Sequence, residues 1–191
     1  QMMTNFLMPF YLVDILLYSQ DVSGLIMLST PIIMMISSPW GGRLTDRLGS
    51  KRPAIIGLMS VGLGSALMSQ LNLDSSIVFI MLALAFFGLG NGFSVSAINT
   101  SIICSIPPEH TGVASGMSST VRNLGQSLGV AVGGMLIALR INTYTNAGSS
   151  LQENAIYLLA QRDTFFFGVV VALIALISIA SIPDVKACGR Q

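Results

Sequence analysis

Long apolar runs separated by short polar stretches fill most of this chain of 191 residues. A bilayer core about 30 Å thick is crossed by roughly 20 helical residues, so each run of about that length predicts a membrane-spanning helix. We expect an all-α integral membrane protein in which the polar segment 140–161 is an exposed loop. The predicted spans, the first of them truncated, are 2–17, 24–40, 53–71, 76–106, 110–139 and 164–182.

Proline and glycine mark the ends and the middle of these runs. Pro53 fits the first turn of the third span, where its missing N–H costs nothing, and Pro107 with Pro108 closes the fourth. The segment 88–92 carries three glycines, which permit a bend or the close approach of another backbone. We therefore expect tight helix packing around the middle of the fourth span.

The composition supports a membrane protein. Hydrophobic residues make up 52% of the chain and charged residues 9%, whereas soluble domains carry about a quarter charged residues. A net charge of +1 is too small to indicate a nucleic-acid partner or a polybasic lipid-binding surface. Cys104 and Cys188 lack metal-ligand spacing, so no metal or redox role is expected. No catalytic constellation or phosphate-binding loop is found, so neither an enzyme nor a cofactor is expected.

A charged island at 42–53 lies between the second and third predicted spans and holds five of the seventeen formal charges. Because basic residues concentrate on the cytoplasmic side of membrane proteins, their distribution predicts the orientation. The island and the tail, which share one side, carry six basic residues, and the other side carries two, Arg140 and Arg162. We expect loop 41–53 and the C-terminal tail to be cytoplasmic.

The island resembles the loop signature of the major facilitator superfamily. Its signature positions are occupied by Gly42, Leu44, Asp46, Arg47, Gly49, Lys51 and Arg52. In addition, segments 111–116 and 121–131 resemble the fifth helix of the C-terminal half in drug:proton antiporters of the fourteen-helix branch. The resemblance covers most of the chain.

The resemblance implies the C-terminal six-helix half of a transporter whose N-terminal half is missing from this sequence. It further implies a small-molecule substrate bound between the halves, a proton gradient as driving force, and a place in the bacterial inner membrane. The chain begins inside an apolar segment without the pattern of a signal peptide, so we expect a fragment.

Two roles are open for the island. It is either a basic anchor at the membrane face or a latch, a charge network that joins the two halves in one state and separates in the other. The glycines at 42 and 49 would allow tight turns at the ends of a short loop, and Lys51 and Arg52 would remain among the lipid headgroups. Within a latch, Asp46 is the expected centre.

Polar residues inside predicted spans are candidate cavity residues, because such residues are costly in a membrane. Arg122 either snorkels to the cytoplasmic interface or faces a central cavity with Asn123 and Gln126. Asn91 and Asn99 are eight positions apart, within roughly 80° around a helix, so both could face one cavity, although interhelical hydrogen bonds explain them equally well.

Gly125, Gly129 and Gly133 recur every four residues, so we expect one smooth helix face for backbone packing. Asp14 stands near the external end of the first span. It is the only carboxylate found close to a predicted span and away from the cytoplasmic loops, and its two explanations are solvation and proton coupling.

The resemblance thus implies a proton-coupled exporter of drugs or other small molecules. The alternatives are a carrier of another solute class, such as a sugar, metabolite or peptide, and a six-span membrane subunit without transport of its own.

Overall fold

The computed structural model describes residues 2–72, 75–146 and 153–181. These residues form helices and their connections, with no strand among them. The elements in chain order are α1 (Met2–Phe10), η1 (a π-helix, Tyr11–Ile15), α2 (Gln20–Met27), α3 (Ser29–Leu48), α4 (Lys51–Met68), α5 (Ile77–Cys104), η2 (a 3-10 turn, Pro108–His110), α6 (Thr111–Asn146) and α7 (Glu153–Ser181). The predicted tail, with Lys186, Cys188 and Arg190, lies outside the described residues.

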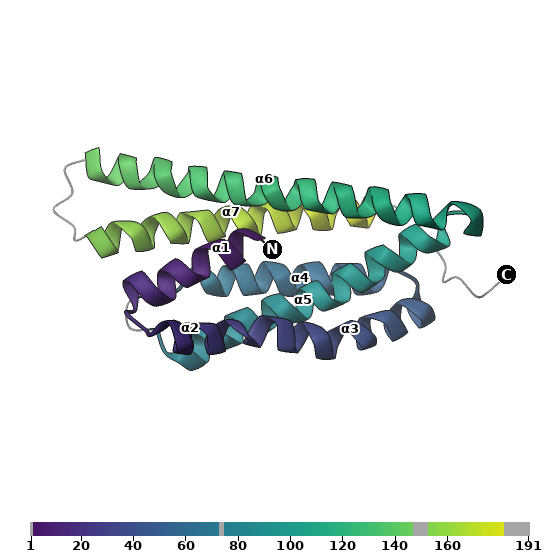
Figure 1. Ribbon diagram of the computed structural model, residues 1–191, viewed down its shortest axis with the longest axis horizontal. Coiled ribbons are helices and arrows are strands. Elements are labelled where there is room, and N and C mark those ends of the chain that lie inside the picture. Colours follow the sequence, from purple (N-terminus) through teal and green to yellow (C-terminus); the bar gives the residue numbers. More distant parts are fainter. Residues whose placement is uncertain (1, 73–74, 147–152, 182–191) are drawn as a thin grey trace.

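The helices form an elongated bundle (Figure 1). In this view α6 and α7 run side by side along one edge, α2 and α3 lie along the opposite edge, and α4 and α5 lie between them. The most extensive packing joins α5 to α3 and α4, and α4 to α7. The α3–α4 turn, η2 and the C-terminal end of α7 gather at one end of the bundle.

Glycines on α4 and α5 allow the backbones of the central helices to approach closely. A Cβ at Gly90 would meet the Gly57 carbonyl oxygen at 2.5 Å, and one at Gly88 would meet the Thr30 carbonyl oxygen at the same distance. A Cβ at Gly92 would collide with the Ser37 hydroxyl. The expected close packing around the middle of this helix is therefore confirmed.

The apolar core gathers where η1 and α1 meet α5 and α7. Leu12, Ile80 and Phe165 are fully buried there. Tyr11 is fully buried as well, and its hydroxyl donates a hydrogen bond of 2.8 Å to the carbonyl oxygen of Asn72 in the α4–α5 connection. A buried phenol needs such a partner, because an unpaired polar group in an apolar setting is costly.

Four helical segments among the described residues are long and apolar enough to cross a membrane: 20–48, 77–104, 111–143 and 156–181. The first predicted span corresponds to the shorter apolar helix 2–15. The third corresponds to α4, which has 18 residues and opens with Lys51 and Arg52. Many apolar side chains on α3, α6 and α7 are exposed, as a lipid-facing or partner-facing surface requires.

Two predicted loops are wrong in large part. The segment 140–161 is mostly helical, since α6 continues to Asn146 and α7 begins at Glu153. Its polar side chains do not prevent a helix, because long helices can protrude beyond a bilayer and satisfy their own backbone hydrogen bonds. Likewise, residues 41–48 of the predicted loop 41–53 belong to α3, so the connection to α4 consists of Gly49 and Ser50 alone.

Candidate functional site: an apolar pocket beside Arg122

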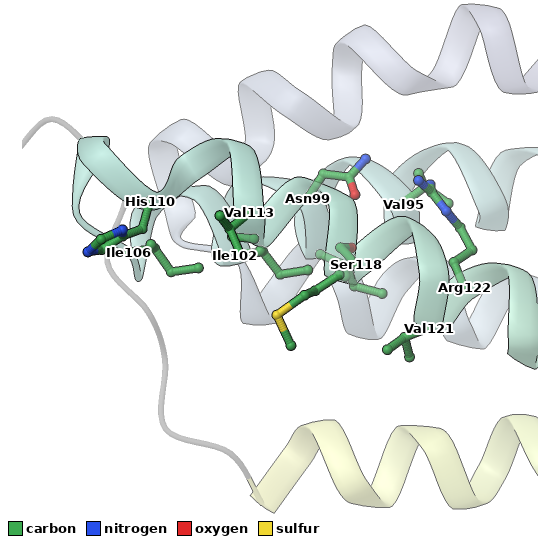
Figure 2. A pocket seen from close by; sticks show the side chains of 12 residues that line it. Val95, Asn99, Ile102, Ile106, His110, Val113, Ser118, Val121 and Arg122 are labelled. Atoms are coloured by element: carbon green, nitrogen blue, oxygen red, sulfur yellow. The ribbon is translucent and has the colours of Figure 1, made fainter.

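A pocket of about 680 Å³ lies between the C-terminal half of α5 and the first third of α6. Figure 2 shows the side chains of both helices around it, with His110 at one end and Arg122 at the other. Its lining is Val95, Ile98, Asn99, Ile102, Ile106, His110, Val113, Ala114, Met117, Ser118, Val121 and Arg122. Aliphatic side chains thus form the walls, and few polar groups interrupt them.

α5 and α6 share few contacts, whereas α5 packs closely on α3 and α4. Bulky side chains such as Ile98, Val113 and Met117 are therefore left 42%, 66% and 66% exposed. Pockets that bind small organic molecules are typically about 300–1,000 Å³ and mostly apolar with a few polar groups. The hollow fits that description.

Arg122 is exposed and makes no hydrogen bond or ion pair with any residue that the structure describes. The membrane-length segment 111–143 has its midpoint at residue 127. At about 1.5 Å per residue, Arg122 is roughly 7.5 Å from that midpoint, well inside half of a core about 30 Å thick. A segment centred in the bilayer would therefore place the backbone of Arg122 within the hydrocarbon core, and the side chain lines the pocket.

A second, smaller hollow of about 210 Å³ adjoins the first and shares Asn99, Ile102, Ser118 and Arg122 with it. Ser115 and Ser119 also line it. The Ser115 hydroxyl donates to the carbonyl oxygen of Thr111, which leaves its oxygen lone pairs to accept further bonds. Arg122 therefore stands at the boundary between an apolar hollow and a more polar one.

The other predicted cavity residues take different positions. Asn91 does not line the pocket: it is buried, and its side-chain amide donates a 2.8 Å hydrogen bond to the Phe87 carbonyl oxygen of its own helix. The two asparagines therefore do not face one cavity, and of the two only Asn99 lines the pocket. Asn123 is exposed and Gln126 half-buried, and neither lines the pocket with Arg122.

The island places its charges at the end of the bundle where α3 meets α4. Gly49 has a φ of 81°, which makes it the turn glycine, whereas Gly42 is helical. A tight turn was expected at both glycines, and at Gly42 this is wrong because α3 continues through it. Leu44 is half-buried, while Asp46, Arg47 and Arg52 are exposed, and Asp46 makes no ion pair with a described residue.

Lys51 has a contact that the sequence did not predict. Its ammonium donates a 2.6 Å hydrogen bond to the carbonyl oxygen of Ala180 in the last turn of α7. A cation at a helix C-terminus is favourable, because unpaired carbonyl groups there carry partial negative charge. Lys51 thus joins the start of α4 to the end of α7. Its expected place among the headgroups stays a prediction.

Of the three glycines expected to form one smooth face of α6, only Gly133 has a close neighbour among the described residues: a Cβ there would meet Met3 Cγ at 2.5 Å. Nothing lies within 4 Å of a Cβ at Gly125 or Gly129. Both instead line an apolar hollow of about 410 Å³ between α6, α7, α4 and α1. Close packing at these two positions remains a prediction.

Asp14 is exposed and stands in η1. π-Helical turns are often found at functional sites, so its setting leaves both explanations of this carboxylate open. Asp163, however, lies on α7 within a membrane-length segment, and its carboxylate is 3.1 Å from Nε of Arg140. The view that Asp14 is the only carboxylate near a span and away from the cytoplasmic loops is therefore wrong, because the last membrane-length segment begins at residue 156, before Asp163, and not at residue 164.

Two further features could not be read from the sequence. Gln161 is 2% exposed, and its amide oxygen and nitrogen both lack a hydrogen-bond partner within the described part of the chain. The helix break at 16–19 includes Leu17 with a φ of 56°. Pro9 in α1, which lacks an N–H donor, was the only nearby signal of irregular backbone. Residues 2–72, 75–146 and 153–181 contain no cluster of three or more metal-ligating side chains.

Comparisons with known proteins agree on one family. The sequence model described as Major Facilitator Superfamily matches residues 1–186. The riboflavin transporter RibZ of Clostridioides difficile is 32% identical over 179 residues, which are 93% of this chain and 38% of that protein. The tetracenomycin C resistance and export protein of Streptomyces glaucescens is 30% identical over 136 residues, 71% of this chain and 25% of that protein.

The fold has a solved counterpart. The structure of the proton:xylose symporter XylE matches 96% of this chain and 41% of its own with a TM-score of 0.66 and 13% identity. That likeness concerns the fold. The chain spans less than half the length of each of these relatives.

Proposed function

Because this chain belongs to the Major Facilitator Superfamily and has a partial form of its fold, we propose that it is part of a proton-coupled exporter of drugs or other small molecules. Several relatives are named as multidrug resistance, drug resistance or export proteins. The proposed location is a bacterial inner membrane. A second helical half, outside the 191 residues, would complete the transporter.

The pocket beside Arg122 is the observation that carries the proposal. It is large enough for a drug-sized molecule and lies on α5 and α6, whose facing surfaces are left open by the described residues. In an alternating-access carrier, substrate binds near the bilayer midplane between two halves that rock against each other. The pocket would be this half's contribution to that site.

The island would serve as the latch on the cytoplasmic side. Asp46 lies in the last turn of α3, where a negative charge is disfavoured by the carbonyl ends of the helix by about 0.3–1 kcal/mol. Its exposed carboxylate is free to accept hydrogen bonds from the second half. Closing and opening of that contact would bias the equilibrium between the two conformations.

Transport itself is tested with the complete transporter in proteoliposomes under an imposed pH gradient. We expect fluorescent drug analogues to move only when the gradient is present and to stop when it is collapsed. Fluxes that stay flat for drugs and for solutes of other classes would favour the non-transporting subunit instead.

The latch is tested with Asp46→Asn. We expect efflux to fall about tenfold or more, since a charge-assisted hydrogen bond contributes about 1.5–3 kcal/mol, while membrane insertion stays intact. Asp21→Asn is the control, because Asp21 is an exposed acid on α2 at the opposite end of the bundle. Normal efflux by the Asp46 variant would refute the latch.

A second candidate is a carrier of riboflavin or a similar planar metabolite. It is favoured by the relative named as a riboflavin transporter, which matches 93% of this chain, more than the 63% matched by the multidrug resistance protein Stp of Mycobacterium tuberculosis. Riboflavin in the same flux assay distinguishes the two candidates.

A further inference from the structure

The pocket between α5 and α6 carries a positive charge that no group in its lining neutralises. Among its twelve lining residues, Arg122 is the only one with a permanent charge, and none is an aspartate or glutamate. The smaller adjoining hollow likewise has no acidic residue in its lining. The pocket therefore favours a negative group and disfavours a positive one.

The arrangement of polar and apolar groups is also uneven. Ile98, Ile102 and Val113 give one region a hydrocarbon wall, whereas Asn99, Ser118 and Arg122 are shared with the polar hollow. In Figure 2 the guanidinium of Arg122 and the amide of Asn99 lie toward the same end, far from His110. A ligand that fills both hollows would need an apolar body and a polar head.

The guanidinium of Arg122 is suited to a ligand whose polar head is a carboxylate. It stays protonated under all physiological conditions, and its planar fork of N–H donors matches a carboxylate with two parallel hydrogen bonds. Such a bond is stronger beside hydrocarbon than in water, because the surrounding dielectric constant is lower. A quaternary ammonium in this pocket would instead meet a like charge in a setting that screens it poorly.

We infer that the pocket beside Arg122 binds amphipathic organic anions, with the carboxylate at Arg122 and Asn99 and the apolar body along α5 and α6. The inference names the substrate class of the proposed transporter and rests on that proposed function. It excludes lipophilic cations from this pocket, although cations could be carried elsewhere in the complete protein.

The test uses one fluorophore in three charge states: a coumarin-3-carboxylate, its neutral methyl ester, and an analogue carrying a trimethylammonium group. Binding to the purified complete transporter is measured by fluorescence polarisation without a gradient, and flux is measured separately in proteoliposomes. The variants are Arg122→Gln and Arg122→Lys. Arg162→Gln is the matched control, because Arg162 is an exposed arginine on α7 away from the pocket.

We expect the carboxylate to bind more tightly than the ester and the ammonium to bind most weakly. Arg122→Gln should weaken carboxylate binding about tenfold or more, the loss expected for a hydrogen-bonded charge, and leave ester binding within about twofold. Arg122→Lys should restore part of the loss, and Arg162→Gln should change nothing.

Two results would overturn the inference. Preference for the ammonium analogue would show that the pocket does not select anions. Equal weakening of ester and carboxylate by Arg122→Gln would show that Arg122 holds an acidic group of the protein instead of the ligand. Charge-selective binding without gradient-driven flux would uphold the anion site and refute the transport proposal, so the two failures are distinguishable.

Discussion

At the scale of single residues, the absence of a side chain at Gly90 sets the spacing of the two central helices. A methyl group there would lie 2.5 Å from the Gly57 carbonyl oxygen and 2.6 Å from the Val61 nitrogen, both of them backbone atoms that cannot rotate away. We predict that Gly90→Ala lowers the free energy of unfolding by about 1–3 kcal/mol, the usual cost of overpacking.

The measurement is thermal unfolding in detergent, followed by circular dichroism. Gly134→Ala provides the control, because nothing lies within 4 Å of a Cβ at that helical position and alanine is the better helix former. Equal melting temperatures for Gly90→Ala and the parent protein would show that α4 and α5 separate easily, against the packing described above.

The sequence alone identified residues whose type is unusual for their position. Arg122 could be singled out because any arginine in an apolar segment needs a reason, and the glycines at 88–92 because only glycine permits such close packing. It was uninformative where the reason is a distant partner. The bond from Lys51 to the Ala180 carbonyl joins residues 129 positions apart, and no local pattern encodes it.

At the scale of elements, α6 and α7 are linked by the ion pair between Arg140 and Asp163, with side chains 51% and 35% exposed. Solvent screens such a pair, and exposed pairs contribute about 0.2–1 kcal/mol. We predict a coupling energy below about 1 kcal/mol in a double-mutant cycle of Arg140→Gln and Asp163→Asn, measured by unfolding in detergent. A coupling several times larger would mean that lipid or a partner half shields the pair from water.

The existence of the helices followed from the lengths of the apolar runs, but the positions of the helix ends did not. Segments 77–104 and 111–143 agree closely with two predicted spans. By contrast, polarity predicts the end of a helix at Arg140 and at Gly42, although both residues are helical. Polar composition indicates where a segment extends beyond the hydrocarbon core of the bilayer. It does not indicate where the helix ends, because the backbone hydrogen bonds of a helix can continue outside the membrane.

At the scale of the whole molecule, the direction of each helix determines where the latch and the pocket face. The α3–α4 turn and η2 share one end of the bundle, while the C-terminal end of α6, which carries Arg140, and the N-terminal end of α7, which carries Arg162, lie toward the other. Apart from Arg122, which lies within the membrane-length part of α6, the described basic residues divide four to two, as the positive-inside rule requires for a cytoplasmic latch.

This topology can be tested at the two ends of α5. Its 28 residues span about 42 Å, more than a bilayer core of about 30 Å, so Gln70 before it and Ser105 after it must lie on opposite sides. Both side chains are exposed. After replacement of the two native cysteines by serine, we predict that an impermeant thiol reagent labels Gln70→Cys in intact cells and Ser105→Cys only in inverted membrane vesicles. The reverse pattern would place the island outside the cell, where it could not act as a cytoplasmic latch.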